Sequence, residues 1–186
     1  MDVKGTAFLA RKAMLIQEIG EARCNEFLAR YALVDPLFAE SILATTTIPI
    51  ARFIAFQEAM VRDLYAGDRM SYFRFGEKSA EWSLTVGPYK HLRETKSLEK
   101  FAELGRLLYQ NFYTAGQAET TIVGNNKVEL RLFGIPEEHH HVYLEYSITA
   151  YFKRGLELVG ARSVMMRRIT GFSVGDFDVH YVYRLG

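Results

Sequence analysis

The chain has 186 residues, about half of them apolar and a quarter charged, which is the composition of a folded domain with a sizeable core. Its 23 lysines and arginines nearly balance 22 aspartates and glutamates, and the net charge of +1 argues against nucleic-acid or anionic-membrane binding. The single Cys24 excludes an internal disulfide. Because no apolar run could span a membrane and the first residues lack a signal peptide, we expect one cytoplasmic domain over residues 1–186.

The first half of the sequence is predicted to be helical. Apolar residues recur every three or four positions there, and glycines or prolines separate the segments. Asp35 is expected to cap a new helical segment with Pro36 at its first position. Thr45 to Thr47 and Pro49 then interrupt the helical pattern. The predicted helices cover residues 6–19, 21–32, 50–65, 70–84 and 97–113.

The second half contains two predicted β-hairpins. Residues 120–123 and 127–133 are β-rich and flank Gly124-Asn125-Asn126, which accept the positive φ angles of a tight turn. Residues 164–169 and 177–183 show the two-residue alternation of β-strands, and Gly175-Asp176 lies between them as a turn signal. They are predicted to form the second hairpin.

A helix is predicted between the two hairpins, from Glu137-Glu138, whose charges suit a helix N-terminus, to Gly160. The order β-β-α-β-β allows both hairpins to join one four-stranded antiparallel sheet with this helix on one face. We therefore predict an α+β fold in which the N-terminal helices complete the core.

The segment ITAYFKRGLELVGARSVMMRRITGFSVGDFDVHYVYRL, residues 148–185, carries a family resemblance. It resembles the C-terminal signature of the superfamily that unites haem nitric-oxide-binding (H-NOX) domains, 4-vinyl-reductase-like domains and the Bet-type subunits of the TRAPP transport complex. It is most similar to a group of stand-alone myxobacterial paralogues of uncharacterised function. The resemblance implies the H-NOX/Bet-type ligand-binding fold, whose members bind haem, small hydrophobic molecules or only other proteins.

The resemblance also implies sites that this sequence lacks. An H-NOX domain is expected to have an axial histidine on a helix and a Tyr-x-Ser-x-Arg set for the haem propionates. The nearest string, Tyr89-Lys90-His91-Leu92-Arg93, has histidine in place of serine and comes early in the chain. The cysteine-based metal site of some 4-vinyl-reductase relatives is missing, since Cys24 stands alone. We assign no cofactor and keep haem as an alternative.

No motif in the sequence indicates catalysis. The chain lacks a GxGxxG loop, a Gly-x-Ser-x-Gly elbow and a P-loop, and Glu137-Glu138 is read as a solvated charge pair. His139-His140-His141 is the strongest metal candidate, but consecutive residues spread over about 200° of a helix and cannot meet one ion. We read this string as a solvated helix start, with one of the three as a haem or metal ligand left open. No catalytic residue and no metal site is assigned.

Aromatic residues on two predicted helices form the candidate ligand pocket. If these helices pack, their rings and hydroxyls would converge as in an apolar pocket with few polar anchors. Ordinary core packing and a partner-binding surface are the alternatives. Gly155, in mid-helix, indicates a close approach to other chain segments or to a ligand. The candidate residues are Tyr109, Phe112, Tyr113, Tyr143, Tyr146, Tyr151 and Gly155.

The leading functional hypothesis is a non-enzymatic sensory or ligand-binding module of bacterial signalling. It would bind a small apolar molecule and relay the change to a protein partner. One alternative is a dimeric scaffold or interaction protein without ligand, and another is a haem-binding gas sensor.

Overall fold

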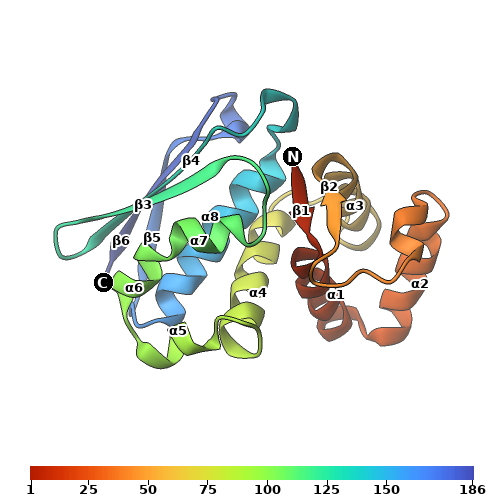
Figure 1. The fold of residues 1–186 in the computed structure, drawn as a ribbon, viewed down its shortest axis with the longest axis horizontal. Coiled ribbons are helices and arrows are strands. Elements are labelled where there is room, and N and C mark those ends of the chain that lie inside the picture. The colour runs from red at the N-terminus through yellow and green to blue at the C-terminus, as the bar shows by residue number, and fades with distance from the viewer.

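An N-terminal lobe forms one end of the molecule (Figure 1, red to tan) in this computed structural model, which describes residues 1–186. Its helices lie close to the predicted bounds, because their apolar periodicity and the caps between them are local signals. A two-stranded antiparallel ribbon, β1–β2, was not predicted, since three-residue strands leave no readable alternation. The elements are β1 (Asp2–Lys4), α1 (Gly5–Ile19), α2 (Glu21–Ala32), the 3-10 helix η1 (Pro36–Ala39), β2 (Thr47–Pro49) and α3 (Ile50–Leu64).

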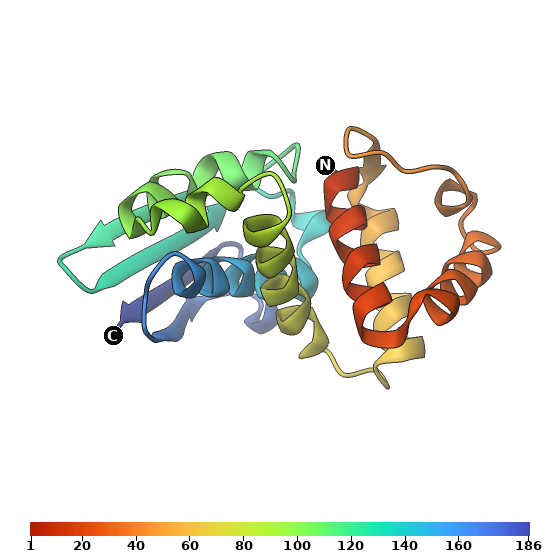
Figure 2. The same ribbon diagram turned by 90° about the horizontal axis from the view of Figure 1, so that it is seen from below.

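The C-terminal lobe is built on one four-stranded antiparallel sheet with the strand order β3-β4-β6-β5. The two hairpins join through β4 and β6, where Leu130 pairs with Tyr181. Helix α8 packs against one face of this sheet, and the predicted α+β architecture is confirmed (Figures 1 and 2). The elements are β3 (Gln117–Val123), β4 (Lys127–Phe133), α8 (Val142–Leu158), β5 (Val164–Thr170) and β6 (Val179–Leu185).

Helix α4 (Ser71–Thr85) packs along α8 on the side of the C-terminal lobe that faces α1 of the N-terminal lobe (Figure 1). After it, the single helix predicted over residues 97–113 is wrong. The chain forms the two short helices α6 (Leu98–Glu103) and α7 (Gly105–Gln110) instead, and α5 (Lys90–Thr95), which was not predicted, precedes them. The break at Leu104 lets Gly105 come so close to β3 that an added Cβ would lie 2.7 Å from a Thr120 methyl. Packing on the sheet therefore overrides the continuous helical pattern.

The predicted start of the helix between the hairpins is also wrong. Glu137–His139 form a 3-10 helix, η2, and α8 begins only at Val142. The imidazole of His141 accepts the Tyr143 backbone N–H at 3.1 Å and so caps α8, a role that the acidic pair was expected to support. The turn between β5 and β6 contains the 3-10 helix η3 (Phe172–Val174), and Gly175 has a φ of 90° as a turn glycine requires.

A single cluster of 41 buried residues runs through both lobes. Phe53 of α3 meets Tyr143 of α8 edge to face with ring centroids 5.9 Å apart, so aromatic contacts cross the junction. None of the helices combines enough length with enough apolar character to span a bilayer.

Candidate functional site

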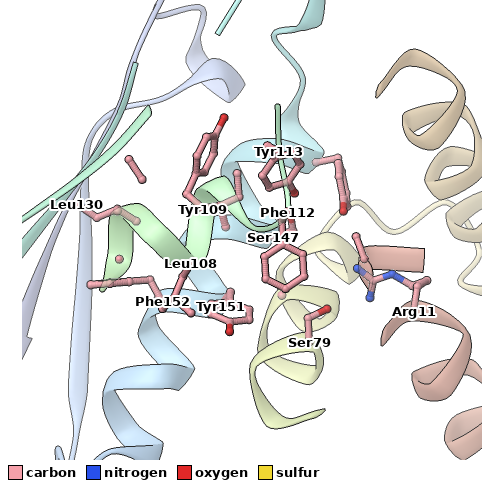
Figure 3. A pocket seen from close by; sticks show the side chains of 16 residues that line it. Arg11, Ser79, Leu108, Tyr109, Phe112, Tyr113, Leu130, Ser147, Tyr151 and Phe152 are labelled. Atoms are coloured by element: carbon pink, nitrogen blue, oxygen red, sulfur yellow. The ribbon is translucent and has the colours of Figure 1, made fainter. Parts of the chain in front are cut away.

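A cavity of about 70 Å³ lies where the two lobes meet (Figure 3). Sixteen residues line it, of which 11 are hydrophobic, and they come from α1 of the N-terminal lobe and from α4, α7, α8, β3 and β4 of the C-terminal lobe. An apolar cavity at a junction between two packed units is a common place for a small-molecule site.

Five of the seven predicted pocket residues line this cavity, because α7, the turn that follows it and α8 converge. These are Tyr109, Phe112, Tyr113, Tyr143 and Tyr151. The other two lie outside it. Tyr146 lies near Arg168 and Tyr181. Gly155 faces the Phe101 ring, where an added Cβ would lie 2.1 Å from Cζ, so close packing explains this glycine. Ligand binding by the five lining residues stays a prediction.

The close crossing of α4 and α8 forms one wall of the cavity. A Cβ added to Gly76 would lie 2.1 Å from the Ser147 carbonyl oxygen and 2.9 Å from Ala150 Cβ, so only glycine allows this approach. At the far end of the crossing, the hydroxyls of Ser83 and Tyr151 are 2.6 Å apart. The small residues Gly76 and Ala80, one helical turn apart, are a sequence signal for this close crossing, which was not predicted from the sequence.

Three of the cavity tyrosines, Tyr109, Tyr113 and Tyr151, are buried phenols. Burial raises the pKa of Tyr109, Tyr113 and Tyr151 above the ordinary value of a phenol, because a charged phenolate would be poorly solvated there. The Tyr109 hydroxyl donates to the Ala115 carbonyl at 2.8 Å. The Tyr151 hydroxyl is likewise paired with Ser83, so these two rings contribute mainly apolar surface to the cavity.

Arg11 of α1 is the charged lining residue among those that sequence reasoning missed. Its side chain is only 2 % exposed, although arginine is mostly found at protein surfaces. Its Nε donates to Gln57 Oε1 at 3.0 Å, and its guanidinium carbon lies 4.2 Å from the Phe75 ring centroid. Ser147, which also lines the cavity, has a buried hydroxyl with no hydrogen-bond partner.

The histidines lie away from the cavity, and the expected solvated start at residues 139–141 is wrong. These three residues are half-buried, and contacts with other parts of the chain fix the side chains of His140 and His141. His140 Nε2 is 2.9 Å from the Ile135 carbonyl oxygen, and its ring stacks on Phe172 at 4.3 Å. His141 Nε2 lies 3.3 Å from Glu58 Oε1. His180 pairs with Glu129 on the sheet at 3.1 Å.

The residues around the cavity do not fit a haem. No histidine or cysteine lines it, so the side chains that most commonly hold haem iron are missing from its wall. His91 and Arg93 of the string Tyr89–Arg93 are exposed on α5 and do not line the cavity. No group of three histidine, cysteine, aspartate or glutamate side chains is arranged to hold a metal ion.

Comparison with known proteins finds likeness in structure alone. No family model and no curated protein matches the sequence. An H-NOX protein from S. oneidensis in the Fe(II)NO ligation state superposes with a TM-score of 0.71 at 14% identity, covering 98% of this chain and 99% of that one.

Two further H-NOX structures show the same likeness. A single-residue variant of Tt H-NOX gives a TM-score of 0.73 at 11% identity, over 98% of this chain and 94% of that one. An unliganded Fe(II) H-NOX mutant from K. algicida gives a TM-score of 0.67 at 10% identity, over 98% of this chain and 96% of that one. The fold is therefore H-NOX-like. Kinship with the 4-vinyl-reductase, TRAPP and myxobacterial groups stays a prediction.

Proposed function

We propose that this chain is a sensory domain without enzymatic activity that admits a small, largely apolar molecule to the cavity between its lobes. The observation that carries the proposal is the cavity itself, mainly apolar and bounded by elements of both lobes. Its volume of about 70 Å³ is near half that of a roughly 150 Å³ engineered cavity that holds benzene, so the fitting ligand has only a few non-hydrogen atoms.

The cavity wall is connected directly to the N-terminal lobe. Lys4 N–H of β1 donates to the Phe112 carbonyl at 2.8 Å, and Thr114 N–H donates to the Asp2 carbonyl at 3.0 Å. Phe112 and Tyr113 line the cavity, so a ligand that displaces their side chains also displaces β1. We infer that occupancy changes the position of one lobe against the other, and that a protein partner reads this change.

Native mass spectrometry of gently purified protein tests the proposal. We expect an adduct of small mass that is lost on denaturation. Ala118→Leu should abolish the adduct without unfolding the chain, because Ala118 lines the cavity and leucine adds enough volume to fill it. Ala22→Leu, at an exposed position on α2, is the matched control and should keep the adduct.

The proposal fails if the wild-type chain carries no adduct and takes up none when exposed to small apolar molecules. An adduct that survives Ala118→Leu would place the ligand elsewhere. A clean apo dimer would favour the alternative of a dimeric scaffold without ligand.

A haem-binding gas sensor is the second candidate, and the structural neighbours favour it over a sensor of unspecified ligand. They are H-NOX proteins, one of them in an Fe(II)NO state. The lining residues argue against it, since none of them is a histidine or a cysteine. Adding haemin to purified protein separates the candidates. A Soret band that disappears on replacing one histidine would establish haem binding, the five histidines being His91, His139, His140, His141 and His180.

A further inference from the structure

Arg11 is a buried cation without an anion. Its side chain is 2 % exposed, and it takes part in no ion pair. Its neighbours are an amide oxygen of Gln57, the Met14 sulfur 3.2 Å from Nη1, and the Phe75 ring. Arginine is rarely buried unless a carboxylate or phosphate pairs with it, because removing the charge from water is costly.

The surroundings of Arg11 leave its charge uncompensated. Desolvation lowers the pKa of Arg11, and the groups that oppose this are the hydroxyls of Tyr143, Tyr65 and Tyr113. A guanidinium nevertheless stays protonated in proteins, so a full positive charge is held among neutral groups. Such a site lacks the anion that would balance this charge.

The uncompensated charge faces the cavity. Arg11 and the partnerless Ser147 hydroxyl both line it, and Ser147 belongs to α8 on the opposite lobe. In Figure 3 the guanidinium lies at the α1 side, while Leu108, Phe152 and Leu130 lie at the far side toward the sheet. The cavity therefore has one polar, cationic end and one apolar end.

We propose that the ligand of this cavity is a short-chain carboxylate, whose carboxylate pairs with Arg11 and accepts from the Ser147 hydroxyl. This inference rests on the proposed function. A guanidinium matches a carboxylate with two parallel hydrogen bonds. The hydrocarbon chain lies against Phe112, Leu108 and Phe152.

The size and charge of the cavity select this class of anion. One cation balances one negative charge, whereas a doubly charged phosphate would bury an excess charge against walls that are mainly apolar. A volume of about 70 Å³ suits about four to six non-hydrogen atoms, the range from acetate to butyrate.

The test compares butyrate with butyramide, its neutral isostere, by isothermal titration calorimetry at constant ionic strength. We expect wild-type protein to bind butyrate at least about tenfold more tightly than butyramide. Arg11→Met should remove this preference, because it deletes the charge and keeps an apolar side chain of similar length. Arg23→Met, at an exposed position of α2, is the control and should keep the preference.

Each outcome bears on one proposal. Equal binding of butyrate and butyramide to wild type, or an unchanged preference in Arg11→Met, overturns the carboxylate and leaves the cavity function standing. Tighter binding of inorganic phosphate than of butyrate also overturns it. If neither probe binds and native mass spectra show no adduct, the proposed function fails as well. Circular dichroism checks folding, and Arg11→Gln replaces Arg11→Met if that variant unfolds.

Discussion

At the scale of single residues, His141 holds two elements at once. Its Nδ1 accepts the Tyr143 N–H that begins α8, and its Nε2 lies 3.3 Å from Glu58 Oε1 of α3. The cap requires an unprotonated Nδ1, so the neutral ring donates from Nε2 to Glu58. Burial, aided by Arg69, lowers the pKa of His141 below its ordinary value, and Glu58 opposes the shift.

This pKa shift predicts an acid-sensitive cap. Because the folded pKa is lower than the unfolded value of 6.5, the unfolded chain binds the proton first. The stabilisation is complete above 6.5 and is lost as the pH falls from there through the lowered folded value. His141→Asn keeps a capping side chain that does not titrate. Between about pH 7.5 and about pH 5.5 the wild type should lose about 1 kcal/mol relative to this variant in urea unfolding. Parallel stability curves would contradict the prediction.

At the scale of elements, the crossing of α4 and α8 determines the shape of the cavity. The backbone of Ser147 blocks any side chain at position 76, and a backbone atom cannot move aside as a flexible side-chain end can. Glu145, fully buried on α8, accepts from the Ser173 N–H at 2.7 Å and from the Tyr181 hydroxyl at 2.5 Å. Helix α8 is therefore held to α4 by packing and to the sheet by hydrogen bonds.

Gly76→Ala should force the two helices apart. Alanine favours a helix by about 1 kcal/mol over glycine, but overpacking costs about 1–3 kcal/mol, so a net loss of about 1 kcal/mol is expected. Thr85→Ala, at the exposed end of the same helix, should change stability by less than about 0.5 kcal/mol. Thermal unfolding measures both variants. A Gly76→Ala protein as stable as the Thr85→Ala control would show that the crossing is loose.

At the scale of the whole molecule, the shared core predicts that both lobes unfold together. The chain carries one natural probe in each lobe, since its single cysteine, Cys24, is buried in α2 and its single tryptophan, Trp82, lies on α4. Thiol reactivity of Cys24 and fluorescence of Trp82 should therefore change at the same urea concentration. Exposure of Cys24 at a lower concentration would mean that the N-terminal lobe is an independent unit.

Local signals in the sequence determined most of the architecture. The bounds of α2 match the predicted residues 21–32, and the glycine turns located both hairpins. The candidate aromatic residues in and after α7 and on α8 were found because periodicity and turn chemistry depend only on neighbouring residues. Five of them line the cavity, although their role as a binding site stays a prediction.

Only the tertiary structure decided what depends on residues far apart in the chain. The helix predicted over residues 97–113 broke because β3 packs against Gly105. Arg11 is buried because α3, α4 and α8 surround it, and its partner Gln57 lies 46 residues away. The sequence by itself therefore specifies the order of the elements and the aromatic wall. The placement of the Arg11 charge at the opposite end of the cavity could not be predicted from the sequence. Other segments of the chain bury this side chain, and the pattern of its own helix does not contain them.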